Sequence, residues 1–143
     1  MKKVLFLAIT ILSFVQCGKR KQHSTWKING QEYSSNDVIV QEYRGEWTLK
    51  SNDKVRFALT FHGSALPTSG NFSITRREDL GMGKVSMGIC IDTVCYGISP
   101  HQTKYLTATI NNKKAQYQMA PAWFVKFNNP NDSILVEGTF NEP

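Results

Sequence analysis

The chain has 143 residues, 41% of them hydrophobic, three cysteines and a formal net charge of +6. Five of the 17 basic residues precede position 22, and from His23 onward twelve basic residues stand against eleven acidic ones. A DNA or RNA reader needs positive charge clustered on its folded surface. The composition therefore excludes nucleic acid as the expected partner and predicts a nearly neutral domain behind a basic leader.

The first sixteen residues have the pattern of an export signal. Lys2 and Lys3 precede the apolar run VLFLAITILSFV, residues 4–15. As a helix this run rises about 18 Å, which does not cross a hydrocarbon core of about 30 Å. We therefore expect residues 1–16 to be a cleaved signal peptide rather than a transmembrane anchor.

A lone cysteine directly follows the apolar run, in the segment Phe14-Val15-Gln16-Cys17. This segment resembles the lipobox of bacterial lipoproteins. Its Gln16, where the family most often has Gly or Ala, resembles the looser lipoboxes of the Bacteroidota. The resemblance implies that Cys17 is the first residue of the mature protein and carries acyl chains such as palmitate. Two or more such chains hold a protein stably on a membrane.

Residues 17–24 then form a basic tether. Lys19, Arg20 and Lys21 lie beside the acyl chains, where each basic residue gains about 1 kcal/mol from anionic lipid head groups. In related lipoproteins an acidic tract after the cysteine resembles a signal for surface export. The basic tract here instead favours a periplasm-facing position in the bacterial cell envelope, with the outer membrane as the expected site of attachment.

The folded region opens with a hairpin signal, TWKINGQEY. Its Asn-Gly pair, residues 29–30, is preferred in a tight type I′ turn. This register places Trp26 opposite Tyr33 and Lys27 opposite Glu32. An aromatic pair on one face and an ion pair on the other are typical of a half-buried hairpin. In the later segment VRFALTFH, residues 55–62, strict alternation predicts a strand with one face toward the core and the other toward water.

The segment KVSMGICIDTVCYGIS predicts a second hairpin, with a two-residue turn at residues 92–93. This register places Cys90 opposite Cys95 at the short Cα separation that a disulfide needs. Exported proteins meet oxidising conditions, so we expect a structural disulfide between Cys90 and Cys95. A redox role is the weaker interpretation, because thiol oxidoreductases generally use Cys-x-x-Cys at the start of a helix.

The last third of the chain predicts further strands. A four-residue loop at residues 111–114 is expected to set Ala108 against Tyr117. Two more strands, WFVKF and SILVEGTF, are expected on either side of a turn at residues 128–132. The spacing predicts one all-β domain over residues 25–143, an antiparallel β-sandwich or rolled sheet of about nine strands built from hairpins.

Two resemblances concern the whole domain. Its opening hairpin (residues 26–30), the LPTSGNFSI segment (residues 66–74) and the final VEGTF strand (residues 136–140) resemble those of small Bacteroidota lipoproteins. That family implies an envelope-attached β-sandwich with no known activity and no catalytic residue. Gly45 and Trp47 are similar to the Gly-x-Trp of bacterial lipocalin-like domains, which would imply a carrier of a small apolar ligand.

No residue pattern predicts catalysis, a metal or a cofactor. His23, His62 and His101 lack the spacing that aims two imidazoles at one metal. The dense charge cluster TRREDLGMGK, residues 75–84, is typical of a solvated loop. A ligand or partner role for Arg76, Arg77 and the two acidic residues after them is the alternative interpretation.

The expected function is therefore that of a non-enzymatic lipoprotein, attached to the membrane through acylated Cys17, with a binding or structural role. The alternative is a lipocalin-like carrier. A protein or glycan partner is open, and exposed aromatic residues such as Tyr43 or Trp123 are the candidates for glycan binding. The tripeptides at residues 92–94 and 132–134 resemble the acceptors used for O-glycosylation of exported Bacteroidota proteins.

Overall fold

The structure is a computed structural model that describes residues 22–143, so the signal peptide, Cys17 and most of the tether lie outside the described residues. Strands account for 67% of this region, which contains no α-helix. The elements in chain order are β1 (Ser24–Ile28), β2 (Gln31–Ser35), β3 (Val38–Tyr43), β4 (Glu46–Ser51), β5 (Val55–His62), β6 (Gly70–Thr75), the 3₁₀ helix η1 (Arg77–Asp79), β7 (Lys84–Ile91), β8 (Val94–Ile98), β9 (Tyr105–Asn111), β10 (Lys114–Lys126) and β11 (Asn129–Asn141).

All the strands belong to one hydrogen-bonded sheet. Its order is β2-β1-β11-β10-β9-β6-β7-β5-β4-β3, and β8 pairs with both β7 and β10. The described chain therefore has eleven strands, and the expected count of about nine is wrong. Part of the excess is β6, which begins at Gly70 in a segment rich in Ser, Gly and Pro, a composition more typical of a loop.

The expectation of purely antiparallel pairing is also wrong. β6 runs parallel to β7, with Ser73 opposite Lys84 and Thr75 opposite Ser86. The reason lies in the connection between the two strands. Residues 76–83, which include η1, bring the chain back alongside β6 in the same direction instead of reversing it in a tight turn.

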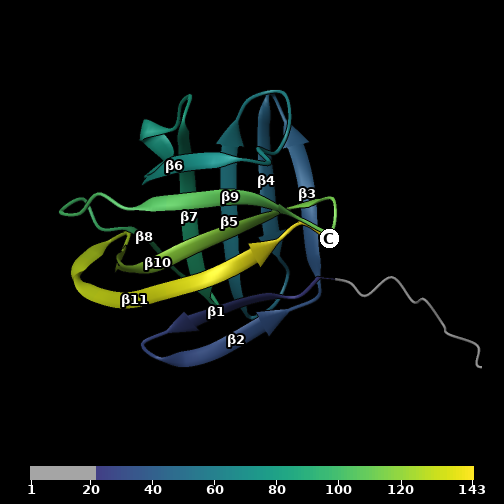
Figure 1. Ribbon diagram of the computed structural model, residues 1–143. Helices are drawn as coiled ribbons and strands as arrows, with labels where there is room; N and C mark the ends of the chain where they lie inside the picture. Colours follow the sequence, from purple (N-terminus) through teal and green to yellow (C-terminus); the bar gives the residue numbers. More distant parts are fainter. Residues whose placement is uncertain (1–21) are drawn as a thin grey trace, which may run out of the picture.

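The sheet folds over on itself, so that one part lies across the other. In Figure 1, β5 and β7 cross behind β9, β10 and β11, and β1 and β2 lie at the bottom of the view. The Phe57 ring of β5 lies 5.3 Å from Trp26 of β1 and 4.7 Å from Phe140 of β11, although β5 pairs with neither strand. The core lies between the two parts. A sandwich of two separate sheets is not confirmed, because hydrogen bonding links all the strands.

The alternation of β5 explains how its residues enter this core. Phe57, Leu59 and Phe61 are at most 2% exposed, and burying each such side chain contributes roughly 1.5–3 kcal/mol. The opposite face departs from expectation at Thr60, which is buried rather than exposed to water. Its hydroxyl lies 3.0 Å from the hydroxyl of Thr48 on β4, so the polar group keeps a hydrogen bond.

Local turn chemistry sets the hairpins as predicted. In β1–β2, Asn29 and Gly30 both have positive φ, and Trp26 pairs with Tyr33. In β7–β8, Cys90 pairs with Cys95, and the two sulfurs form a disulfide with a Cα–Cα distance of 4.1 Å.

The register of β9–β10 is confirmed, with Ala108 opposite Tyr117. Its loop, however, has two residues instead of four. Asn111 still pairs with Lys114, and the intervening Asn112 and Lys113 both adopt positive φ.

β10 and β11 form the longest hairpin, and here two predicted boundaries are wrong. The segments expected as separate strands near Tyr117 and near Trp123 are one strand, because a bulge between Met119 and Ala122 lets pairing continue past Pro121. Proline has no N–H for the ladder, and a bulge is where a strand tolerates it. The turn lies at residues 127–128, so β11 begins at Asn129 rather than after Asp132.

Within residues 22–143 there is no helix of the length and apolar character needed to cross a membrane.

Candidate functional site

Two grooves lie along the outward face of the β10–β11 hairpin. One crosses β1, β11 and β10 near the end of β11, and we name it the Thr139 groove. The other lies beside the turn between β10 and β11, and we name it the Trp123 groove. They share the same two strands but differ in how they are built.

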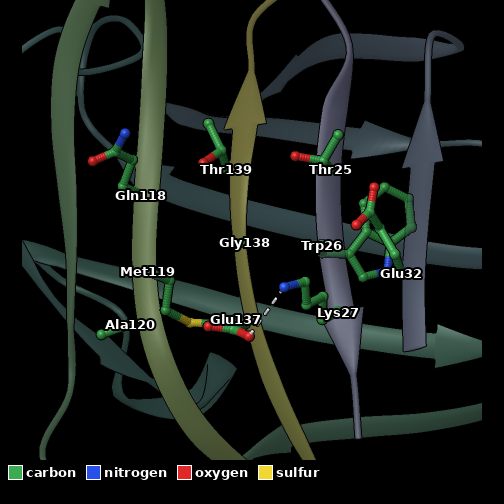
Figure 2. A pocket seen from close by; sticks show the side chains of 10 residues that line it. All are labelled: Thr25, Trp26, Lys27, Glu32, Gln118, Met119, Ala120, Glu137, Gly138 and Thr139. Atoms are coloured by element: carbon green, nitrogen blue, oxygen red, sulfur yellow. Dashed lines mark ion pairs between the residues drawn. The ribbon is translucent and has the colours of Figure 1, made fainter. Parts of the chain in front are cut away.

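The Thr139 groove is a shallow, open strip of about 400 Å³ on the surface of the sheet. Figure 2 shows Thr25, Thr139 and Gln118 side by side across three strands, with Lys27 and Glu137 pointing toward each other below them. The Lys27 Nζ lies 4.0 Å from Glu137 Oε1. The lining residues are Thr25, Trp26, Lys27, Glu32, Gln118, Met119, Ala120, Glu137, Gly138 and Thr139.

At the base of the Thr139 groove, position 138 has no space for a side chain larger than that of glycine. A Cβ on Gly138 would lie 2.7 Å from the Cβ of Trp26 and 2.8 Å from the backbone oxygen of Thr25. Trp26 is 1% exposed, and its ring packs against Phe57 in the core. The tryptophan of this groove therefore belongs to the interior rather than to the outward surface.

The Trp123 groove has a volume of about 550 Å³, within the range of about 300–1,000 Å³ typical of ligand sites. One wall is the connection between β8 and β9, and the other is the start of β11. The outward side chains of β10 lie between these walls. The lining residues are those at positions 99–102, Trp123 and Val125 of β10, and Pro130, Asn131 and Ser133 of β11.

Hydrogen bonds hold the first wall against β10. The backbone N–H of Ser99 donates to the carbonyl oxygen of Trp123 at 2.9 Å, and the side-chain amide of Gln102 donates to the same oxygen. Within the connection, the His101 N–H donates to the Ser99 hydroxyl. The wall is thus fixed directly at the backbone of Trp123.

The second wall contains its own turn. The Asn131 N–H donates to the side-chain oxygen of Asn129 at 3.2 Å, a local bond that shapes the start of β11. Val125, 7% exposed, lies deep between the walls, whereas Trp123 is 50% exposed. The groove is therefore formed before any ligand arrives, with a half-exposed indole on its border.

The groove lining contains no Asp, Glu, Lys or Arg side chain. Five of its nine residues carry hydroxyl, amide or imidazole groups, and the others are Pro, Val and Trp. Lys126 and Asp132, which neighbour the lining residues Val125, Asn131 and Ser133 in the chain, form an ion pair, with Lys126 Nζ 3.6 Å from Asp132 Oδ2. The Tyr96 hydroxyl donates to the same carboxylate, and burial together with Asp132 raises the pKa of Tyr96.

The predicted site residues are widely separated in the structure. His101 lies on the Trp123 groove, whereas His62 ends β5 and His23 precedes β1. Among residues 22–143, no group of three or more His, Cys, Asp and Glu side chains gathers as metal ligands do. In the charge cluster, Arg77 of η1 forms an ion pair with Glu46 of β4, which explains this arginine structurally.

Both aromatic candidates for glycan binding are exposed, Tyr43 at 65% and Trp123 at 50%. Their surroundings differ. Tyr43 ends the edge strand β3, with the Arg44 guanidinium 5.0 Å from its ring, and it borders neither groove. Trp123 borders a groove with two walls. The two walls could not be predicted from the sequence, because nothing in their segments SPHQ and NNPND indicates which strand each segment packs against.

Two other sequence candidates lie elsewhere. Trp47 is on β4, opposite Phe61 of β5, and therefore not on the first strand of the sheet. Thr93 lies exposed at the β7–β8 turn and Ser133 lies exposed on β11, so both residues that resemble O-glycosylation acceptors are at the surface. Cys17 lies outside the described residues.

Comparisons of the chain with known protein families, with curated proteins and with solved structures find no match.

Proposed function

We propose that this protein is a non-enzymatic lipoprotein of the bacterial cell envelope that presents the Trp123 groove to a ligand. Acylated Cys17 holds it on the membrane, and the groove faces away from that membrane. The observation that carries the proposal is the position of the domain's first residues, at the end of the β10–β11 hairpin opposite the groove.

Three hydrogen bonds fix this position. The Asn141 N–H donates to the Ser24 hydroxyl at 2.9 Å, and the Asn141 side-chain amide donates to the His23 carbonyl oxygen at 2.6 Å. The Gln22 amide donates to the carbonyl oxygen of Asn111 at the β9–β10 turn. The tether therefore enters beside the end of β11.

The groove lies at the other end of the same strand. Ser133 precedes Asn141 by eight residues of β11, which is about 26 Å along a strand. Residues 17–23 extend at most about 25 Å, so an acylated Cys17 keeps the tether end close to the bilayer. The Trp123 groove then points into the periplasm, where a ligand reaches it freely.

Charge near the tether supports the same orientation. Lys113 and Lys114 lie at the β9–β10 turn, beside the point at which the chain enters the domain. Each lysine near an anionic leaflet gains about 1 kcal/mol, so these two lysines favour the same end of the domain facing the membrane. We propose a periplasm-facing position on the outer membrane for this reason.

A lipocalin-like carrier is the less favoured function, because such a carrier needs an apolar cavity inside its sheet. Instead, aromatic side chains contact one another in the interior. Phe61 and Tyr117 lie 5.0 Å apart between ring centroids, and both are at most 2% exposed. The packing of these rings supports a ligand site on the outside of the sheet.

The anchoring part of the proposal is tested by Cys17→Ala. We expect the variant to leave the membrane fraction for the soluble fraction, and mass spectrometry of the wild-type N-terminal peptide to find acyl chains on Cys17. The double variant Cys90→Ala/Cys95→Ala is the matched control, because it removes two cysteines but should stay in the membrane fraction. Retention of Cys17→Ala in the membrane would contradict the proposal.

A further inference from the structure

We infer that the ligand of the Trp123 groove is a neutral saccharide, with a sugar ring stacked on the indole of Trp123. The inference rests on the proposed function, since it names the ligand class for the same groove. Three properties of the groove carry it: a half-exposed aromatic face, an uncharged polar lining and an open shape.

The first property is the position of the indole. Trp123 lies outward on β10, 50% exposed, and its backbone oxygen is tied to the Ser99–Gln102 wall by two hydrogen bonds. An aromatic ring offers a large apolar face at low cost in conformational entropy, and its faces carry partial negative charge. The C–H groups on one face of a sugar ring are apolar and slightly positive. They match such a surface.

The second property is the set of polar groups beside the indole. The Ser133 hydroxyl and the Asn131 side-chain amide line the groove and make no hydrogen bond to another described residue. The Gln102 amide nitrogen binds the Trp123 carbonyl, which leaves its side-chain oxygen to accept. Hydroxyls and amides both donate and accept hydrogen bonds, as sugar hydroxyls require.

The third property is the absence of charge in an open groove. An acidic saccharide or a phosphate would need a cation, and the groove lining contains no Lys or Arg side chain. Lys126, next to Val125 in the chain, is paired with Asp132. Pro100 and Pro130 add apolar surface on opposite walls, so a chain of sugars lies between them. A neutral oligosaccharide satisfies the whole lining.

A proline-rich peptide is the main competing ligand, because such peptides also dock on aromatic grooves. Those grooves are usually lined by several aromatic residues. Here Trp123 is the single Trp, Tyr or Phe residue in the lining, and five of the nine residues are polar. The composition therefore favours the saccharide.

The test is a calorimetric titration of the full acylated chain, in a detergent without sugar head groups. The probes are cellotetraose, maltotetraose, mannotetraose and chitotetraose, with tetragalacturonate and a decaproline peptide as comparators. We expect at least one neutral tetrasaccharide to bind with a Kd below about 1 mM. Failure of all four to bind, or binding of a comparator instead, would overturn the inference.

Variants locate the binding. Trp123→Ala should weaken binding at least about tenfold, whereas Trp123→Phe should retain most of it because the aromatic face remains. Tyr43→Ala is the matched control, since it removes an even more exposed aromatic residue outside the groove. Asn131→Ala, at an exposed position, should weaken binding severalfold and serves if Trp123→Ala does not fold. An unchanged affinity in Trp123→Ala, or an equal loss in Tyr43→Ala, would refute the assignment.

The same titration separates this inference from the anchoring proposal. Soluble Cys17→Ala protein should bind the sugar as the wild type does. Loss of sugar binding with anchoring intact counts against the saccharide alone. Membrane retention of Cys17→Ala with sugar binding intact counts against the anchor alone.

Discussion

The Thr139 groove and the Trp123 groove lie on the same face of the same two strands, yet only the second has walls. The first is built from strand residues, and its Lys27, Glu32 and Glu137 carry charge. The second is completed by residues 99–102 and by the irregular start of β11, and its lining is uncharged. A regular sheet surface offers a shallow strip. The connections at its end convert that strip into a site that can surround a ligand.

The tryptophans of the two grooves provide the strongest test of this difference. Trp26 is 1% exposed and Trp123 is 50% exposed. Trp26→Ala should lower the free energy of unfolding by roughly 3–5 kcal/mol, because it leaves a cavity beside Phe57. Trp123→Ala should lower it by less than about 1 kcal/mol. Urea denaturation followed by circular dichroism measures both, and equal losses would show that Trp123 is also structural.

Gly138 tests the base of the Thr139 groove. Gly138→Ala should cost roughly 1–3 kcal/mol of stability, because the new Cβ would overlap Trp26 and the Thr25 carbonyl. Gly81→Ala is the matched control, since nothing lies within 4 Å of its Cβ position and its φ is not in the left-handed region. The same urea experiment should give a change within about 0.5 kcal/mol for Gly81→Ala. A comparable loss there would mean that overlap with Trp26 and Thr25 is not what makes Gly138→Ala destabilising.

Tyr117 predicts a pH effect in the core near the Thr139 groove. Burial, and then Glu142, raise the pKa of Tyr117 above its ordinary value near 10. The folded state favours the neutral phenol, so its contribution is complete below about pH 10 and is lost as the pH rises further. Its hydroxyl donates to the Pro67 carbonyl oxygen at 2.9 Å.

Tyr117→Phe should therefore cost about 1 kcal/mol at neutral pH, from the lost hydrogen bond, and should reduce the fall in stability above pH 10. Thermal unfolding between pH 7 and pH 11 measures both effects. Tyr96→Phe, at the Trp123 end, serves for comparison, because burial and Asp132 raise the pKa of Tyr96 as well. Identical alkaline profiles for wild type and Tyr117→Phe would contradict the assignment.

The smallest expected effect belongs to the ion pair in the Thr139 groove. The Lys27 and Glu137 side chains are 48% and 42% exposed, and water screens such pairs. Glu137→Gln should change stability by less than about 0.5 kcal/mol. It should leave saccharide binding unchanged, since this pair lies outside the Trp123 groove. A clear loss of binding would mean that the two grooves act together.

The strand pairings that could be predicted from the sequence are those between strands joined by a short turn. The pairings of Trp26 with Tyr33, Cys90 with Cys95 and Ala108 with Tyr117 are all confirmed, because short turns fix the register of the strands beside them. The parallel pairing of β6 with β7 and the position of β1 beside β11 were not foreseen. Such pairings join distant segments, and packing between the two parts of the folded sheet decides them.

In the candidate site, too, local features were predictable from the sequence and tertiary contacts were not. Trp123 was predicted as an exposed aromatic candidate for glycan binding, and it is half exposed in the structure. Tyr43, proposed together with it, is more exposed than Trp123 but borders neither groove. What distinguishes the two is the wall at Ser99 and Gln102, a tertiary contact across more than twenty residues of chain.

The pairing of β1 with β11 also sets the order in which the molecule completes its fold. Ser24 and Asn141 are separated by 117 positions, so the first strand of the domain is paired on both sides only after the last strand has formed. Contacts between residues so far apart in the chain form late in folding, because the entropy cost of closing the long loop comes before the favourable free energy of the contact. Until Phe140 arrives, Trp26 lacks one of the rings that bury it. A chain cut short before β11 would thus leave its first hairpin without a partner strand, and proteolytic cleavage near residue 30 would report that incomplete fold.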